Sequence, residues 1–173
     1  MNRIQQKPLL ILGLSTMALI VALTLSCAGK PKGPRFEALA GPGQDSALVY
    51  LYRDDRVKGV GAARLQFDDE KIGKLRNGEY TALIVYPGRH TLQSALMWLG
   101  LFARSWHKMD FEVEGGQTRY IRLSASTQSL GSGPAAAAAP GRSHEKAAVV
   151  LTMGPVDRST GSQQISTLRR AQN

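Results

Sequence analysis

The chain has 173 residues, and its 22 lysines and arginines against 13 aspartates and glutamates give a formal net charge of +9. This balance favours anionic partners, but the basic residues are scattered, and no run has the character of a nucleic-acid-binding arm. The single cysteine excludes an intramolecular disulfide framework. We therefore expect no nucleic-acid partner and a fold held by its apolar core.

Residues 1–26 have the outline of a bacterial export signal. Arg3 and Lys7 precede an apolar run from Leu9 to Leu25. The run is slightly longer than a usual signal core and slightly shorter than the roughly 20 residues of a comfortable membrane span. Its length alone therefore does not distinguish a cleaved signal from an uncleaved anchor.

The position of Cys27 distinguishes them better. The stretch LTLSC, which ends at this cysteine, resembles the lipobox of bacterial lipoproteins, in which the cysteine is acylated and becomes the mature N-terminus. The alternatives are an uncleaved signal anchor, or a secretory signal cut nearby that leaves a free thiol. We predict lipidation, because it consumes an otherwise unpartnered thiol. Since Ala28 follows where inner-membrane lipoproteins commonly have Asp, we expect the periplasmic face of the outer membrane rather than the inner membrane, in a cell that has an outer membrane.

Residues 27–45 are rich in glycine and proline and have no apolar period. This composition predicts a flexible tether between the lipid and a domain.

Residues 46–153 carry short runs in which apolar and polar residues alternate, separated by turn signals at Asn77-Gly78, which predicts a tight hairpin, and at Pro87-Gly88. The turns are spaced about ten residues apart, which is typical of a sandwich or barrel. We therefore predict an all-β fold, an antiparallel β-sandwich of the Ig-like or PEGA-like kind with about seven to eight strands. The predicted strands are 46–53, 63–69, 72–75, 79–86, 89–95, 107–113, 118–124 and 147–153.

Two segments do not fit this pattern. Residues 127–145 are of low complexity and too poor in large apolar groups to pack a core, which predicts a mobile loop. In the tail 154–173, Ile165 and Leu168 stand at helical spacing. We expect this tail to be mostly disordered or to form one short helix.

Three motifs in this order, VYLYR, PGRHTL and GGQTRYIRL, resemble a family of small domains of unknown function that is common in bacterial envelope lipoproteins. The resemblance covers about residues 46–125, and its outline is also similar to PEGA-type β-sandwich domains of surface proteins. It implies a β-sandwich, and it carries no established activity.

The sequence offers little for catalysis or metal binding. His90, His107 and His144 lie outside any nucleophile motif, and Asp68–Glu70 lack the regular spacing of a calcium loop. We read the acidic cluster as a solvated hairpin turn and His90 as a hydrogen-bonded turn residue. The expectation is a non-enzymatic protein without cofactor or metal. The alternative is a small envelope hydrolase whose site assembles only in the fold.

The stretch ALMWLGLFARSWHK, residues 95–108, is nearly continuous in apolar side chains and bordered by basic ones. Either it covers an open end of the sandwich and supplies core, or it contacts a membrane or a partner. The candidate contact residues are Trp98, Leu99, Phe102, Arg104, Trp106 and Lys108.

The sequence as a whole predicts a lipid-anchored envelope protein with a binding or scaffold domain. Its expected partners are the membrane, reached through the N-terminal lipid, and an anionic envelope component or an envelope protein.

Overall fold

The structure, a computed structural model, describes residues 31–172 except 56, 58–59, 99–101, 104–105 and 130–146. Contacts divide the chain into residues 1–30 and 31–173, and only the second unit is described here. The predicted signal peptide, Cys27 and all but the first three residues of the predicted mobile loop lie outside the described residues.

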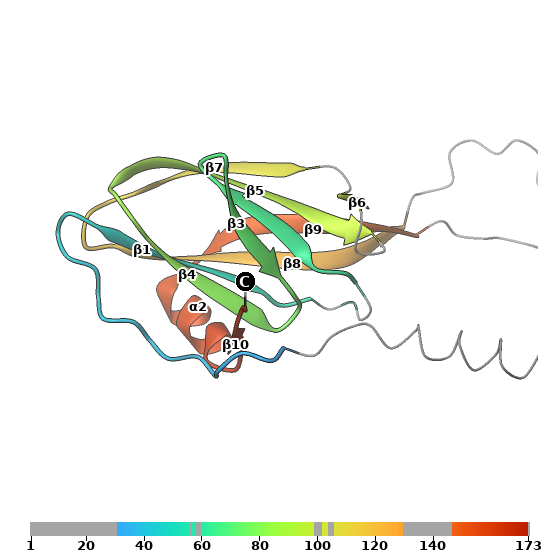
Figure 1. The fold of residues 1–173 in the computed structure, drawn as a ribbon, viewed down its shortest axis with the longest axis horizontal. Helices are drawn as coiled ribbons and strands as arrows, with labels where there is room; N and C mark the ends of the chain where they lie inside the picture. The colour runs from blue at the N-terminus through green and yellow to red at the C-terminus, as the bar shows by residue number, and fades with distance from the viewer. Residues whose placement is uncertain are drawn as a thin grey trace, which may run out of the picture. The chain divides into compact units, whose positions relative to one another are not determined.

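Ten strands and one helix form the described part of the domain (Figure 1). In chain order they are β1 (Ala47–Arg53), β2 (Ala63–Phe67), β3 (Glu70–Leu75), β4 (Glu79–Val85), β5 (Gly88–Trp98), β6 (Phe102–Ala103), β7 (His107–Val113), β8 (Thr118–Ser129), β9 (Ala147–Val156), α2 (Arg158–Ile165) and β10 (Arg169–Arg170).

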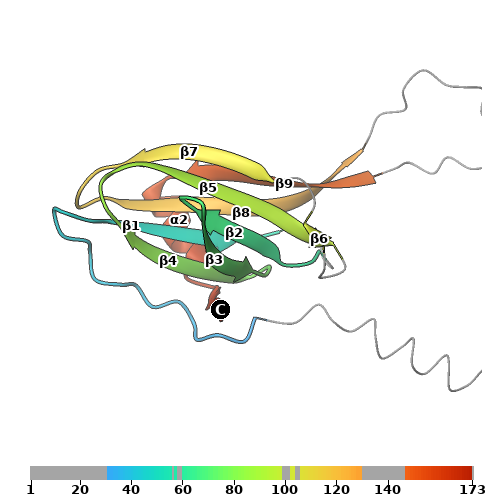
Figure 2. The ribbon, with the colours of Figure 1, turned by 45° about the horizontal axis from the view of Figure 1, so that its top comes forward.

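The strands form two sheets, which Figure 2 shows facing each other. Sheet A has the order β10-β4-β1-β8-β9, and sheet B has the order β3-β2-β5-β6 with β7 also paired to β5. The predicted all-β sandwich is confirmed. Most neighbours are antiparallel, but β1 with β8 and β4 with β10 are parallel pairs.

The main core lies between the inner faces of the two sheets. β2 shows how the alternation builds it, because Ala63, Leu65 and Phe67 are buried while the residues between them are partly exposed. β1 differs, because all seven of its residues are buried. A strand of that kind needs cover on its outer face as well.

The cover on the outer face of sheet A is an aromatic cluster. Tyr50 stacks on Tyr120 with ring centroids 5.2 Å apart, and Phe36 meets Tyr80 edge-on at 5.2 Å. Ile165 of α2 is fully buried in the same cluster. Edge-to-face and offset ring pairs of this kind stabilise a fold beyond the area they bury.

This cover corrects one expectation and decides between the two alternatives of another. Residues 31–45 are not a free tether throughout, since the Phe36 N–H donates to the Leu168 carbonyl at 3.0 Å and the Leu39 N–H to the Tyr50 hydroxyl at 3.0 Å. For the tail, the expectation of one short helix holds and that of disorder does not, since the tail forms α2 and, after it, β10. The physical reason is the tyrosine face, by which we mean Tyr50, Tyr80 and Tyr120 on the outer side of sheet A. Isolated apolar residues of both segments pack on these rings.

The turns also differ from expectation at one position. Asp68 and Asp69 both have positive φ, 47° and 66°, so they make the tight β2–β3 hairpin. Gly78 also has a positive φ of 81°, but its turn joins β3 of sheet B to β4 of sheet A. The predicted Asn77-Gly78 hairpin is therefore wrong, because this turn changes sheet.

Candidate functional site

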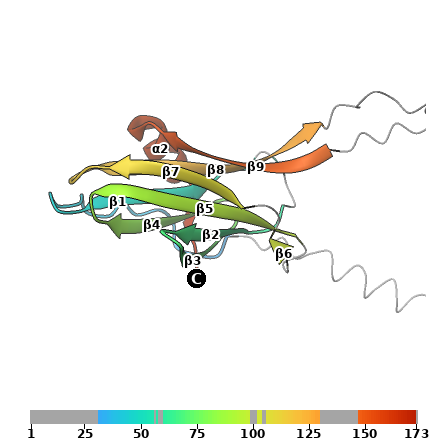
Figure 3. The same cartoon turned by 90° about the horizontal axis from the view of Figure 1, so that it is seen from above.

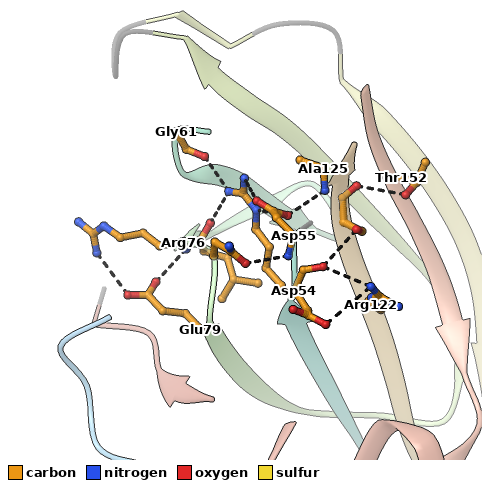
Figure 4. A network of polar contacts seen from close by, with 12 residues as sticks. Asp54, Asp55, Gly61, Arg76, Glu79, Arg122, Ala125 and Thr152 are labelled. Atoms are coloured by element: carbon orange, nitrogen blue, oxygen red, sulfur yellow. Dashed lines mark hydrogen bonds and ion pairs between the residues drawn. The ribbon is translucent and has the colours of Figure 1, made fainter. Parts of the chain in front are cut away.

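A buried ion pair lies at the end of the sandwich where β1 finishes (Figure 4). The Arg53 guanidinium donates from Nε to Asp55 Oδ1 at 3.0 Å and from Nη2 to Asp55 Oδ2 at 2.6 Å. Both side chains are completely buried. This two-bond geometry is the strong form of an arginine–carboxylate contact.

The pair is tied to both sheets. Arg53 Nη1 donates to the Gly61 carbonyl at 2.7 Å and to the Leu75 carbonyl at 3.1 Å, which reach it from the sheet B side. The Ala125 N–H of β8 donates to Asp55 Oδ1 at 2.8 Å. The network therefore joins β1, β3 and β8 and fixes the path of the chain after β1.

Two partly exposed ion pairs extend the network. Arg122 Nη2 lies 3.7 Å from Asp54 Oδ2, and Arg76 Nη1 lies 3.5 Å from Glu79 Oε1. Glu79 is nearly buried and also accepts from the Arg76 N–H at 2.8 Å. Because its charged groups already have partners, we interpret this network as a structural brace.

Arg53 and Asp55 were not singled out from the sequence. A signal for Arg53 existed, because it continues the inward phase of Ala47, Val49 and Leu51 and so places a charge where the pattern asks for a core residue. Nothing in the sequence identified Asp55 as its partner.

His90 is held by two acceptors. Its Nδ1 lies 2.6 Å from Asp68 Oδ2, and its Nε2 lies 2.8 Å from the Tyr86 carbonyl. Burial lowers the pKa of His90, but the Asp68 hydrogen bond, the Tyr86 carbonyl and the Asp68 charge outweigh burial and raise it. With both ring nitrogens hydrogen-bonded, His90 is a bonded residue, as the sequence suggested, but it lies in the first residues of β5 and not in a turn. Both hydrogen bonds of the His90 ring are made to groups of the protein itself, so no bound ligand is needed to hold the ring.

Asp68 also has a structural role in the turn between β2 and β3. Its second carboxylate oxygen accepts the Thr91 N–H at 2.8 Å, and Asp69 accepts from the Gln93 amide at 2.9 Å. Within the described residues, no three histidines, cysteines or carboxylates come together as a metal site.

An open depression of about 410 Å³ lies between α2 and the end of β1. It is lined by Asp54, Thr160, Gln163, Gln164, Thr167 and Leu168. The Tyr52 hydroxyl donates to Gln164 Oε1 at 2.6 Å, and burial raises the Tyr52 pKa. This lining can hydrogen-bond a small polar ligand, but it pairs no hydroxyl with a histidine.

The tryptophan-containing segment is divided by the structure. Leu96 and Met97 are buried, whereas Trp106 is 40% exposed and Lys108 is exposed. β6 pairs with the end of β5, and Figure 3 shows β6 at the same end of the domain as the free ends of β8 and β9. Leu99 and Arg104 lie outside the described residues, and the Trp98 and Phe102 side chains are not described.

The remaining candidates are scattered. His107 begins β7, and His144 lies outside the described residues.

Other large exposed apolar side chains include Ile84 and Tyr86, which are 71% and 82% exposed toward the end of β4. Among the helices that the structure describes, none is long and apolar enough to cross a membrane.

These features define a two-sheet β-sandwich protein braced by a buried ion pair. Residues 43–135, more than half of the chain, match a family described as a protein of unknown function (DUF2846). The chain belongs to this family. None of the curated proteins compared with the chain matches it.

Proposed function

We propose that this protein is a lipid-anchored component of the bacterial envelope, and that its β-sandwich is a non-enzymatic binding or scaffold module. The observation that carries the proposal is the lone Cys27 at the end of an apolar run, in a stretch that resembles a lipobox. Two or three acyl chains hold a protein stably at a bilayer, whereas one chain does not. Because Ala28 follows the cysteine, the proposed location is the periplasmic face of the outer membrane rather than the inner membrane.

Two contacts support a binding or scaffold role over catalysis. Asp55 is fully engaged with Arg53 and the Ala125 N–H, and His90 has an acceptor at each ring nitrogen. A general base needs a free lone pair aimed at a substrate proton. Neither group offers one. The sequence motifs also resemble PEGA-type domains of surface proteins, and such a relationship would fit a module that holds or binds.

The surface for such binding includes Trp106 and Lys108 at the start of β7, which are both exposed. Tryptophan favours the bilayer interface, and a neighbouring cation favours anionic groups. Because Leu96 and Met97 in the same segment are buried, only its second half is proposed as a contact. The proposed partner is an anionic envelope component or an envelope protein.

The anchor is tested by labelling cells with radioactive palmitate. The native chain should take up label, and a Cys27→Ala chain should take up none. Mass spectrometry of the native protein should find a mature N-terminus at the modified cysteine. Equal label in both chains, or an intact Met1 terminus in the native protein, would contradict the anchor.

The competing function is a small hydrolase that uses the depression beside α2, where Thr160 and Thr167 supply hydroxyls next to Asp54. The purified chain should show no turnover of ester or amide substrates beyond that of an Asp54→Asn/Thr160→Val variant. Turnover that this variant abolishes while keeping its fold would replace the binding role by catalysis.

A further inference from the structure

Basic residues that are far apart in the sequence meet where the described chain begins. Arg35 pairs with Arg169 of β10 in an antiparallel bridge, and the Arg170 N–H donates to the Pro34 carbonyl at 2.8 Å. Arg169 Nη1 also donates to the Gly33 carbonyl at 3.0 Å. These contacts add residues 33–36 to the edge of sheet A beyond β10.

The turn before β4 brings a further cation to the same place. Arg169 is in register with Glu79, and a side chain on Gly78 would lie 3.2 Å from the ring of Pro31. Arg76 begins this turn and exposes half of its side chain. The basic edge, as we name it, consists of Lys32, Arg35, Arg76, Arg169 and Arg170.

The basic edge carries a positive excess. Its buried acid, Glu79, is paired with Arg76, and Glu37 is an exposed acid nearby in the sequence. Lys32, Arg35 and Arg170 are exposed and form no ion pair within the described part of the chain. Three unpaired cations therefore face solvent next to the point where the chain leaves toward Cys27.

The distance to Cys27 is bounded by the chain itself. Pro31 follows Cys27 by four residues, and a fully extended chain spans at most about 3.6 Å per residue, so the two are within about 14 Å. From Phe36 onward the chain is fixed to sheet A by packing on Tyr50 and Tyr80. We call the chain between the proposed lipid on Cys27 and the fixed part of the domain the leash. The leash is thus far shorter than the predicted tether of residues 27–45.

We propose that the basic edge binds the anionic headgroups of the bilayer that holds the Cys27 lipid, and thereby fixes the orientation of the sandwich. This inference rests on the proposed lipid anchor. Basic residues at a membrane surface attract anionic lipid by about fivefold each in equilibrium constant, and the attraction decays within about a Debye length of 8 Å. A leash of this length lets the cations come within that range.

A purely structural role predicts a different outcome. Charged residues on an edge strand also prevent pairing with other chains, and such residues need no lipid partner. The experiment must therefore separate contact with lipid from protection of the edge.

The test uses the full chain, processed and acylated in cells, then reconstituted in vesicles of phosphatidylcholine alone or mixed with phosphatidylglycerol. A fluorophore is placed on an engineered cysteine near the basic edge, Gln172→Cys, or at the opposite end of the domain, Glu114→Cys. Both positions are exposed, and acylation blocks Cys27 from labelling. A quencher on the lipid headgroups reports how close each position lies to the membrane.

The test variant is Lys32→Gln/Arg35→Gln/Arg170→Gln. Its matched control, Lys71→Gln/Arg89→Gln/Arg158→Gln, removes the same charge from exposed positions on β3, β5 and α2. We expect stronger quenching at position 172 than at 114, more so with phosphatidylglycerol. The test variant should lower the equilibrium constant for the orientation in which the basic edge faces the membrane, by about fivefold for each residue replaced. The control should leave this constant nearly unchanged.

Equal effects of the two triple variants would mean that net charge alone acts, and would overturn the inference. No effect of the test variant would also overturn it, and would assign the cations to edge protection. Flotation of the native and Cys27→Ala chains with neutral vesicles tests the anchor separately. If both chains float equally, the proposed function fails whatever the quenching shows.

Discussion

The buried pair of Arg53 and Asp55 allows a quantitative test of the fold. Asp55→Ala removes two charge-assisted hydrogen bonds, of 3.0 and 2.6 Å, and leaves a guanidinium with no exposure to water. It also removes the acceptor of the Ala125 N–H. Breaking a buried pair by deleting one partner costs about 3–5 kcal/mol. Since whole domains have about 5–15 kcal/mol of stability, this loss should be large.

The measurement is urea unfolding of the full-length chain, followed by circular dichroism, for Asp55→Ala and for Asp54→Ala. The control is one residue away and carries the same chemical change, but its ion pair with Arg122 is partly exposed and 3.7 Å long. Exposed pairs contribute about 1 kcal/mol or less. Adding Arg53→Met to Asp55→Ala should recover part of the loss, because it removes the unpaired charge.

Equal losses for Asp55→Ala and Asp54→Ala would refute this reasoning. So would a double variant that is less stable than Asp55→Ala alone. Either result would mean that the Arg53 guanidinium reaches water or another acceptor once Asp55 is gone, and that the brace is not sealed from solvent.

Three further changes test other parts of the fold by the same unfolding measurement. Ser94→Ala should be neutral or stabilising by up to about 1 kcal/mol, because its fully buried hydroxyl has no hydrogen-bond partner among the described residues; a loss above that would show a hidden partner. Gly161→Ala should destabilise although alanine favours helix by about 1 kcal/mol, since its Cβ would lie 2.5 Å from the Tyr120 ring; a gain would show that α2 shifts freely. His90→Gln should lower the free energy of unfolding more below about pH 6.5 than in alkaline solution. The reason is that the pKa of His90 is raised in the folded state, so protonated His90 stabilises the fold until the pH rises through that pKa. A loss that does not depend on pH would contradict the charged contact with Asp68.

The alternation of residues predicted most of the strands, because one face of each strand lies in the core between the sheets. β2 and β7 show this directly, since their apolar residues are more buried than the polar residues between them. Which strands belong to which sheet was harder to predict from the sequence. The Asn77-Gly78 turn has the φ of a hairpin glycine, but local conformation does not say whether the next strand pairs back or crosses to the other sheet.

The brace and the packing of the predicted tether could not be derived from local patterns for a related reason. The pair of Arg53 and Asp55 is completed by residues far along the chain, because the Leu75 carbonyl accepts from Arg53 and the Ala125 N–H donates to Asp55. Phe36 stands alone in a polar stretch and reads as a linker residue until Tyr50 and Tyr80 are placed beneath it. Such contacts depend on tertiary structure, which a single sequence does not display.

The family region and the cover of sheet A do not coincide. Residues 43–135 contain β1 to β8, including Tyr50, Tyr80 and Tyr120, but the groups that cover these rings come from residues 31–40 and 157–170. The tyrosine face is thus part of the family region in this chain, and its cover is supplied from outside that region. Because Phe36 both shields the rings and helps to hold residues 33–36 on sheet A, its packing links two properties, namely the stability of the sandwich and its distance from the proposed lipid. A change that loosens Phe36 together with the contacts of Gly33 and Pro34 to β10 would lengthen the leash and carry Arg169 and Arg170 away from the membrane without altering a single charge.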